Sequence, residues 1–377
     1  MDDLYSFFST KHFAELPLND AQHDLQIGKR IQAVTDYNND WSAADIVIIG
    51  CGEQRGKNMQ TPWSHGADAV RAELYRMYDW HPSVKIADMG NILEGATPGD
   101  TRAALRTVLQ EVEAAGKIAI VIGGSHDLTL QQYDVFRKSE RTINAAVVDM
   151  KIDLEETEGI SDEGFLMDML TDQPNFIRHF SHLGFQSYYV NPKMLETLDK
   201  LRFDCFRLGK VREDMDEMEP VLRSCDLLSI DLNAIRNCDA PFVKDGSPNG
   251  FFGDEICQLT RYAGMSHQLS SLGIYGYDPT SDPHRQGAKL IAQMLWYFVD
   301  GYLVRKNEAS LSNLDEFIEY NVALTGNDTL FIKSKKTNRW WMQLPDGNFT
   351  PCSYNDYLTA GNNEIPERWF REQERIV

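Results

Sequence analysis

Short apolar runs, separated by amphipathic stretches, are the feature that most constrains the fold of this chain. The apolar runs indicate buried strands at residues 45–50, 84–89, 118–122, 143–149, 182–186, 203–208, 227–231 and 272–277. Helical patterns separate most of them, at residues 67–78, 100–115, 128–138, 165–180, 192–201, 254–265 and 284–301. Apolar strands of this kind are typical of a parallel sheet that is covered on both faces. The alternation therefore predicts an α/β domain with one parallel sheet and helices on both sides.

The charge of the chain argues against one class of partner. The chain has 37 Lys and Arg against 57 Asp and Glu, which gives a formal net charge of −20. Nucleic-acid binding needs a basic face, so we expect no nucleic-acid partner. No apolar run reaches the roughly 18 residues of a transmembrane span, and the start of the chain lacks the features of a signal peptide. The six cysteines show no C-x-x-C pair or zinc spacing, and we expect free thiols, a cytoplasmic location and no membrane contact.

The residue pattern of the segment after about residue 325 differs from that of the rest of the chain. Residues 329–334 and 339–344 predict a β-hairpin. We expect a main domain over residues 1–325, in which residues 1–43 form a lead-in, and a C-terminal appendage over residues 326–377. The appendage either packs on the main domain or lies at a subunit interface, where aromatic residues are enriched. Three tryptophans are concentrated in it: Trp340, Trp341 and Trp369.

Polar side chains follow three of the predicted strands. They are His126 after the first of these strands, Asp149, Lys151 and Asp153 after the second, and Asp231 and Asn233 after the third. Ligands of parallel sheets bind at the carboxyl ends of the strands, so we expect these side chains to lie close together. A histidine with three aspartates is typical of a site for a hard metal ion. Manganese suits these ligands, as do zinc and iron less specifically.

Three ordered motifs resemble the ureohydrolases, the family of arginase, agmatinase and formimidoylglutamase. Gly123–His126 resembles the family motif GG-x-H, Asp149–Asp153 resembles D-A-H-x-D, and Ser229–Pro241 resembles S-x-D-x-D-x-x-D-P-x-x-A-P. The resemblance covers roughly residues 45–303 and is closest to the formimidoylglutamase branch. It implies a three-layer α/β/α fold with an eight-stranded parallel sheet and assembly into a homo-oligomer. The implied activity is hydrolysis of an amidine or guanidine C–N bond, with two manganese ions that activate water.

Carried over position by position, the resemblance retains only one set of metal ligands. His126, Asp149, Asp153 and Asp231 match the ligands of one family ion, whereas Lys151 and Asn233 replace the private ligands of the second. The three aspartates and Lys151 together carry −2, which one divalent ion balances. We therefore expect at most one manganese ion, with the Lys151 ammonium where a second ion would lie. A metal-free salt-bridge cluster, with a protonated His126, stays open as the alternative.

The substrate residues implied by the family are less complete. The family glutamate that holds the amidinium falls on Gly276, and the loop histidine of arginase has no counterpart in Ser161–Phe165. If the protein is an enzyme, Asp153 and Lys151 are the catalytic candidates, with Lys151 polarising the amidine or positioning water.

Three functions follow from these patterns. The first is metal-dependent hydrolysis of a linear amidine that resembles N-formimidoyl-glutamate. The second is an inactive homologue that acts as a binding or interaction protein. A third interpretation, a dinucleotide-binding oxidoreductase, rests on Gly50–Gly56 alone, where the third glycine of the usual motif is misplaced.

Overall fold

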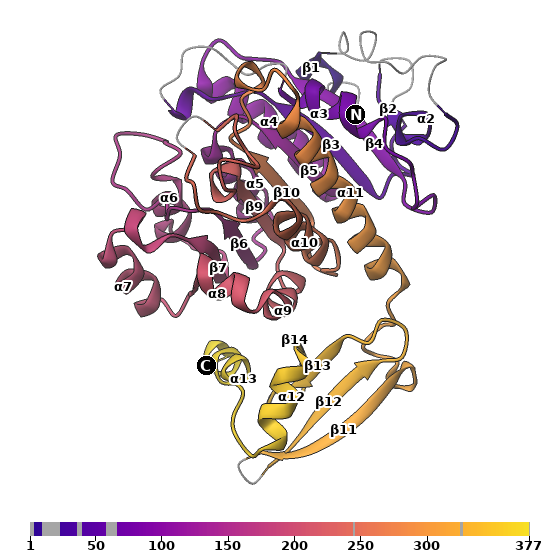
Figure 1. Ribbon diagram of the computed structural model, residues 1–377, viewed down its shortest axis with the longest axis vertical. Helices are drawn as coiled ribbons and strands as arrows, with labels where there is room; N and C mark the ends of the chain where they lie inside the picture. Colours follow the sequence, from indigo (N-terminus) through magenta and orange to yellow (C-terminus); the bar gives the residue numbers. More distant parts are fainter. Residues whose placement is uncertain are drawn as a thin grey trace.

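The computed structural model describes residues 4–9, 23–35, 40–57, 66–243, 246–324 and 327–376. Figure 1 shows an α/β body, in which helices cover both faces of a large sheet, and a smaller part that contains the C-terminus. Among the described residues no helix is long and apolar enough to cross a bilayer. All six cysteines are free, and only Cys238 is exposed.

The eight predicted parallel strands are all present in the main sheet. Their bounds are β3 Ile46–Cys51, β4 Ile86–Ile92, β5 Ile118–Gly123, β6 Ile143–Val148, β7 Ile177–Phe185, β8 Asp204–Arg207, β9 Leu227–Asp231 and β10 Ser271–Tyr275. They lie in the order β4-β3-β5-β10-β9-β6-β7-β8, and every neighbouring pair is parallel. Two short strands, β1 (Phe8–Ser9, antiparallel) and β2 (Gln32–Ala33, parallel), pair with β4 and bring the sheet to ten strands. The predicted α/β/α fold is confirmed.

Helices cover both faces of this sheet because the apolar side chains of each strand point alternately to either side. Ile48 and Ile120 pack into one core with Val70 of α3 and Ile291 of α11. Val47 belongs to a separate core on the other face. The helices of the body are α2 Ile27–Arg30, α3 Gly66–Leu74, α4 Pro98–Ala114, α5 Thr129–Lys138, α6 Phe165–Thr171, α7 Pro192–Lys200, α8 Leu208–Glu213, α9 Met218–Arg223, α10 Gly253–Gly264 and α11 Gln286–Asn307.

One predicted element is wrong. The sequence pattern indicates a helix over residues 165–180, but α6 ends at Thr171 and β7 already begins at Ile177. Pro174 lies between them, and proline cannot continue a helix because it lacks the backbone N–H. β7 therefore starts five residues before the predicted strand at residues 182–186 and pairs with β6 along its length.

The C-terminal part is a four-stranded antiparallel sheet with two helices. The strands are β11 Phe317–Leu324, β12 Asn327–Ser334, β13 Trp340–Gln343 and β14 Phe349–Cys352, and the helices are α12 Tyr354–Gly361 and α13 Glu367–Ile376. The predicted hairpin is present as β12 and β13, which pair Phe331 with Met342. This sheet begins at Phe317, ahead of the boundary that the sequence pattern places at residue 325.

Two arginines join the C-terminal sheet to the body. The buried Arg223, at the end of α9, donates from Nη2 to the carbonyl oxygens of Trp340 (2.9 Å) and Cys352 (3.4 Å). Its guanidinium also lies 4.3 Å from the centre of the Trp341 ring. In the other direction, Arg339 of the appendage donates to the carbonyl oxygen of Met265 at 3.1 Å. Trp341 is thereby buried in the junction, whereas the Trp340 ring packs on Tyr357 within the appendage.

We expect Arg223→Ala to lower the free energy of unfolding by about 2–4 kcal/mol, because it leaves two buried carbonyls without their charged donor. Arg202→Ala is the matched control: Arg202 pairs with Glu374 of the same appendage, but its side chain is 62 % exposed. That exposed pair should contribute less than about 1 kcal/mol. Urea unfolding followed by tryptophan fluorescence measures both values, and equal stability of the two variants would contradict the role of Arg223.

Candidate metal centre

The carboxyl ends of three strands bring the predicted metal ligands to one point. Val148 of β6 pairs with Ile230 of β9, and Ile230 pairs with Ile274 of β10, so the strand ends lie level. β10 lies between β9 and β5, whose end leads directly into the loop of His126. Asp149 follows β6, Asp231 is the last residue of β9, and Asp153 lies in the segment after β6. The sheet order therefore gathers residues that are far apart in the sequence.

One imidazole nitrogen faces all three carboxylates. His126 Nδ1 lies 3.0 Å from Asp153 Oδ2, 3.2 Å from Asp149 Oδ2 and 3.7 Å from Asp231 Oδ2. Ligand atoms that share one small divalent ion, with bonds of about 2.1 Å, lie about 3.0–3.4 Å apart in octahedral or tetrahedral geometry. The ligand atoms of His126, Asp149 and Asp153 also lie within 4.8 Å of one another. This donor set fits one divalent ion, and carboxylate with imidazole is a combination that suits manganese.

Burial and mutual contact set the protonation of the cluster. His126 is fully buried and the three aspartates are 2–5 % exposed. Burial disfavours the imidazolium, but hydrogen bonds to Asp149 and Asp153 outweigh it and raise the pKa of His126 to about 10. Burial and the charge of Asp149 raise the pKa of Asp153 well above its usual value, whereas His126 lowers that of Asp149 against the effect of burial. Metal binding must therefore displace the proton that His126 carries at neutral pH.

Backbone N–H groups orient two of the carboxylates. Asp149 Oδ1 accepts from the backbone N–H of Lys151 at 3.1 Å, and Asp231 Oδ1 accepts from that of Asn233 at 2.8 Å. In both residues the other oxygen, Oδ2, is then the one that faces His126. Lys151 and Asn233 stand at the positions where the resemblance predicts ligands of a second metal. Their backbone N–H groups nevertheless hold Asp149 and Asp231, and a backbone N–H is present whatever the side chain is.

The Lys151 side chain bonds outside the cluster. Its ammonium lies 3.1 Å from Glu163 Oε1, and both side chains are substantially exposed. Burial lowers the pKa of Lys151, but the hydrogen bond and charge of Glu163 outweigh it and raise the pKa above its usual value. Glu163 was not singled out in the sequence, because nothing in its pattern distinguishes it from other exposed acidic residues.

Gly276 occupies the place of the family glutamate, and its backbone leaves no room for a side chain. Its φ is +87°, a conformation that favours glycine. A Cβ atom there would lie 2.9 Å from Asp231 Oδ1. The Gly276 N–H donates to the carbonyl oxygen of Gly124 at 2.8 Å, which fixes this segment against the loop of His126.

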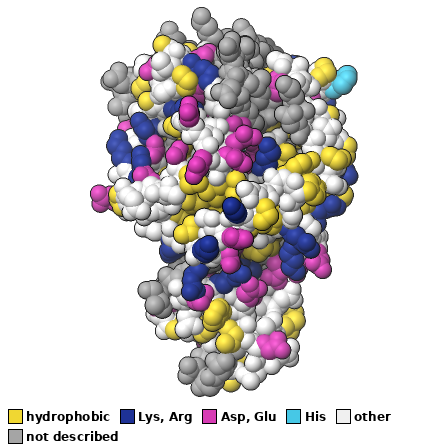
Figure 2. Space-filling model, turned by 90° about the vertical axis from the view of Figure 1, so that its left-hand side faces the viewer, with side chains coloured by type: hydrophobic (Ala, Val, Ile, Leu, Met, Phe, Trp, Pro, Cys, Tyr) yellow, Lys and Arg dark blue, Asp and Glu magenta, His cyan; other side chains and the backbone are white. Residues whose placement is uncertain are grey.

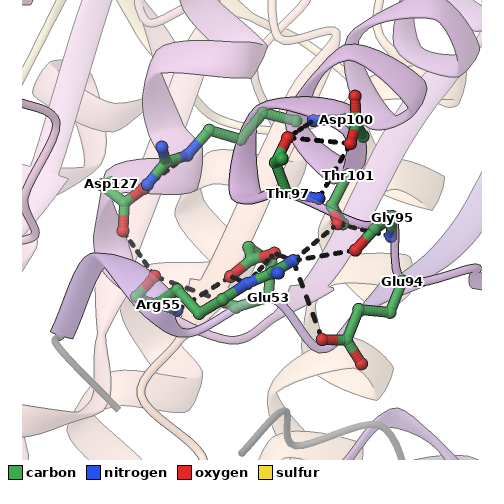
Figure 3. A network of polar contacts seen from close by, with 10 residues as sticks. Glu53, Arg55, Glu94, Gly95, Thr97, Asp100, Thr101 and Asp127 are labelled. Carbon is green, nitrogen blue, oxygen red and sulfur yellow. Dashed lines mark hydrogen bonds and ion pairs between the residues drawn. The ribbon is translucent and has the colours of Figure 1, made fainter. Parts of the chain in front are cut away.

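A polar network supports the loop of His126 from the side of β3. Figure 3 shows Arg55 lying against Glu53, with Thr101 beside it; Arg55 Nε donates to Glu53 Oε1 at 2.9 Å. The Glu53 carbonyl oxygen accepts from Ser125 N at 2.8 Å, and a Cβ on Gly124 would lie 1.9 Å from that oxygen. Gly124, the second glycine of the GG-x-H motif, is therefore required because the Glu53 carbonyl leaves no room for a side chain.

The glycines of Gly50–Gly56 have a similar structural explanation. A Cβ on Gly56 would lie 1.9 Å from Asp127 Oδ1, and one on Gly50 would lie 1.9 Å from Asn91 Oδ1. Gly56 lies within the short 3-10 helix η2 (Arg55–Lys57). In the described part of this connection the glycines serve packing against the His126 loop and β4, and the dinucleotide interpretation gains no support.

The other imidazole nitrogen is held by a buried hydroxyl that the sequence analysis did not assign. His126 Nε2 lies 2.9 Å from Ser229 Oγ, which in turn lies 2.6 Å from Thr129 Oγ1. All three residues are fully buried. A proton on Nε2 that is donated to Ser229 leaves the Nδ1 lone pair free for an ion. Ser229 is the first residue of the S-x-D-x-D motif, so the signal was present.

We expect Ser229→Ala to weaken manganese binding about 10- to 100-fold, because the imidazole then loses its orienting partner. Ser229→Thr, which keeps a hydroxyl, should restore most of the affinity. Ser271→Ala removes another buried hydroxyl, one that accepts from Gln132 at 2.7 Å, and serves as the control. Calorimetric titration with Mn²⁺ measures all three variants; equal losses in Ser229→Ala and Ser271→Ala would contradict a specific role for Ser229.

Known proteins that resemble this chain in sequence include formimidoylglutamases. Formimidoylglutamase from Chromobacterium violaceum is 24 % identical over 276 residues, which cover 67 % of this chain and 87 % of the relative. Formimidoylglutamase from Klebsiella pneumoniae is 22 % identical over 296 residues, which cover 74 % of this chain and 92 % of the relative.

Solved structures show the same fold. A Trypanosoma cruzi formiminoglutamase, solved with manganese, has a TM-score of 0.66 at 18 % identity, covering 74 % of this chain and 99 % of its own. Formimidoylglutamase from Bacillus subtilis also has a TM-score of 0.66, at 15 % identity, covering 78 % of this chain and 99 % of its own. At these identities the similarity establishes the fold alone. The model of the Arginase family matches residues 44–300, most of the α/β body, and the chain therefore belongs to the Arginase family.

Proposed function

We propose that this protein is a single-ion member of the Arginase family that hydrolyses a linear amidine resembling N-formimidoyl-glutamate. The observation that carries the proposal is the convergence of Asp153 and Asp149 on His126 Nδ1 at 3.0 and 3.2 Å, spacings that one divalent ion can bridge, with Asp231 Oδ2 next to them at 3.7 Å. The curated relatives named formimidoylglutamase suggest the substrate class, and the manganese in the Trypanosoma cruzi structure suggests the metal.

The residues of this chain divide the work as follows. His126, Asp149, Asp153 and Asp231 hold the ion, and Ser229 keeps the imidazole oriented. The chemistry that a divalent ion supplies in such a site is activation of water and stabilisation of negative charge. Asp153, whose pKa burial raises, can hold a proton only while no ion is bound, because the ion would take the same carboxylate. Lys151, paired with Glu163 at the edge of the cluster, is the candidate for orienting the amidine.

A second candidate function is a binding protein without hydrolytic activity. It is favoured by two observations: the cluster is nearly closed to solvent, and Gly276 cannot carry the carboxylate that holds the amidinium in the family. In this function the ion, or a proton on His126, stabilises the fold only.

The experiment combines metal counting with an activity assay on the parent and on Lys151→His/Asn233→Asp. We expect about one Mn²⁺ per chain in the parent and about two in the double variant, because the variant regains both private ligands while the backbone N–H groups stay in place. Lys151→Gln, which removes only the ammonium, should still bind one ion. Loss of N-formimidoyl-glutamate is followed in each protein.

Each outcome decides between the functions. One ion in the parent with measurable hydrolysis supports the proposal. One ion, or none, without hydrolysis in the parent, but hydrolysis in the double variant, supports the binding protein. Two ions in the parent would overturn the single-ion site.

A further inference from the structure

A cavity of about 520 Å³ lies between the α/β body and the C-terminal part, and it is called the junction cavity below. One wall is formed by residues of β7, β8, α8 and α9 of the body, and the other by residues of α12 and α13. In Figure 1, α13 lies just below α8 and α9. Small-molecule sites have volumes of about 300–1,000 Å³ and often lie between domains. The junction cavity therefore has the size and the position of a ligand site.

The junction cavity is separate from the candidate metal centre. The metal centre lies at the carboxyl end of β6, where Asp149 N donates to the carbonyl oxygen of Leu183 at 3.2 Å. The cavity reaches β7 earlier in the strand, at His179 and Ser181, and Ser181 pairs with Asp204, the first residue of β8. The helices of the other wall lie beyond the residues that the family model matches. A ligand of this cavity would therefore not occupy the candidate metal centre.

Polar contacts hold the two walls of the junction cavity together. Arg368 of α13 donates from Nη2 to the carbonyl oxygen of Glu217 and to its Oε2, both at 3.2 Å. Arg371, on the same helix, pairs with Asp204 of β8. His179, which is only 8 % exposed, holds the other oxygen of Asp204, with Nε2 at 2.9 Å from Oδ2. The cavity is thus formed without a ligand, which reduces the free-energy cost of binding.

The lining of the junction cavity carries an excess of negative charge. Six carboxylates line it against three fixed cations, so its net charge is −3 with His179 neutral. The carboxylates are Asp204, Asp214, Glu217, Asp356, Glu367 and Glu372, and the cations are Lys210, Arg368 and Arg371. On the face that Figure 2 shows, acidic and basic side chains gather where the body meets the C-terminal part.

The arginines of the cavity are already bound to carboxylates. Besides Glu217, Arg368 holds Asp356, whose Oδ2 accepts from Nε at 3.1 Å. Besides Asp204, Arg371 holds Glu367, whose Oε1 accepts from Nε at 3.0 Å. An anionic ligand would have to displace these carboxylates, whereas a cation meets the negative excess directly. The charge of the lining therefore selects a cationic ligand.

A small metal ion does not suit this arrangement, because it needs several ligand atoms that converge on one point. Within the described parts of the chain, the one group of three such side chains with ligand atoms close enough is that of the candidate metal centre. The carboxylates of the junction cavity come from both walls, as Asp214 of the body and Glu372 of α13 do. Apolar side chains, among them Val221 and Ile365, line the cavity as well. A cation with several charges spread along an apolar chain matches both features.

We propose that the junction cavity binds an aliphatic polyamine, a linear cation whose ammonium groups are separated by methylene segments. Three ammonium groups balance the excess of three carboxylates, and the methylene segments cover the apolar side chains of the lining. Because the ligand contacts both walls, its binding strengthens the attachment of the C-terminal part to the body.

Calorimetric titration of the full chain with spermidine, at about 0.15 M salt, tests the proposal. We expect about one spermidine per chain. Asp214→Asn in the body wall and Glu372→Gln in the appendage wall should each weaken binding about fivefold, because each removes one lining carboxylate. Glu196→Gln is the control, since Glu196 is an exposed carboxylate on α7 outside the cavity. Circular dichroism checks that each variant is folded.

The control separates a specific site from general attraction to a chain with a net charge of −20. An equal loss of affinity in Glu196→Gln and in the two cavity variants would overturn the proposal, as would the absence of saturable spermidine binding to the parent. Butylamine, which carries a single ammonium group, should bind at least about tenfold more weakly than spermidine. Butylamine binding of equal strength would contradict a ligand with several separated charges.

Discussion

The burial of three carboxylates around one imidazole nitrogen is the constraint on which the rest of this molecule depends. Removing such charges from water costs several kcal/mol per ion unless each gains a partner. Here the partners come from separate elements: His126 follows β5, Asp149 follows β6, and Asp231 ends β9. β10 and β9 lie between β5 and β6, so the cluster lies where the strand order reverses, the usual ligand position in such sheets. The sheet order and the buried charges therefore require one another.

The substitutions at this site follow a physical logic. The resemblance to the family predicts metal ligands at the positions of Lys151 and Asn233, and the backbone N–H groups of these two residues bind Asp149 and Asp231. Because any residue supplies that N–H, the second set of ligands can be lost without loosening the first. The contact between Gly276 and Asp231 points the same way: a larger residue would displace the carboxylate that remains.

The sequence was most informative where one residue type has one physical role. Apolar runs predicted all eight parallel strands, and the strand-end positions correctly indicated that His126, Asp149, Asp153 and Asp231 lie close together. The pattern failed at residues 172–180, where a helical spacing of apolar residues competed with Pro174 and lost. The pattern also gave no sign of β11, in which apolar and polar residues alternate only weakly. It gave no sign of the Lys151–Glu163 pair either, because the spacing of residues does not determine how an exposed side chain turns. Ser229 was overlooked although it stands in the motif, since its partner is brought near only by the fold.

In a metal-free cluster, a proton on His126 supplies part of the positive charge that a divalent ion would supply. Crystals grown with manganese, with anomalous diffraction measured at the manganese edge, test the single-ion account most directly. The account predicts one peak per chain, bounded by His126 Nδ1 and the Oδ2 atoms of Asp149, Asp153 and Asp231. A second peak beside Asn233, or no peak in that position at saturating manganese, would contradict it.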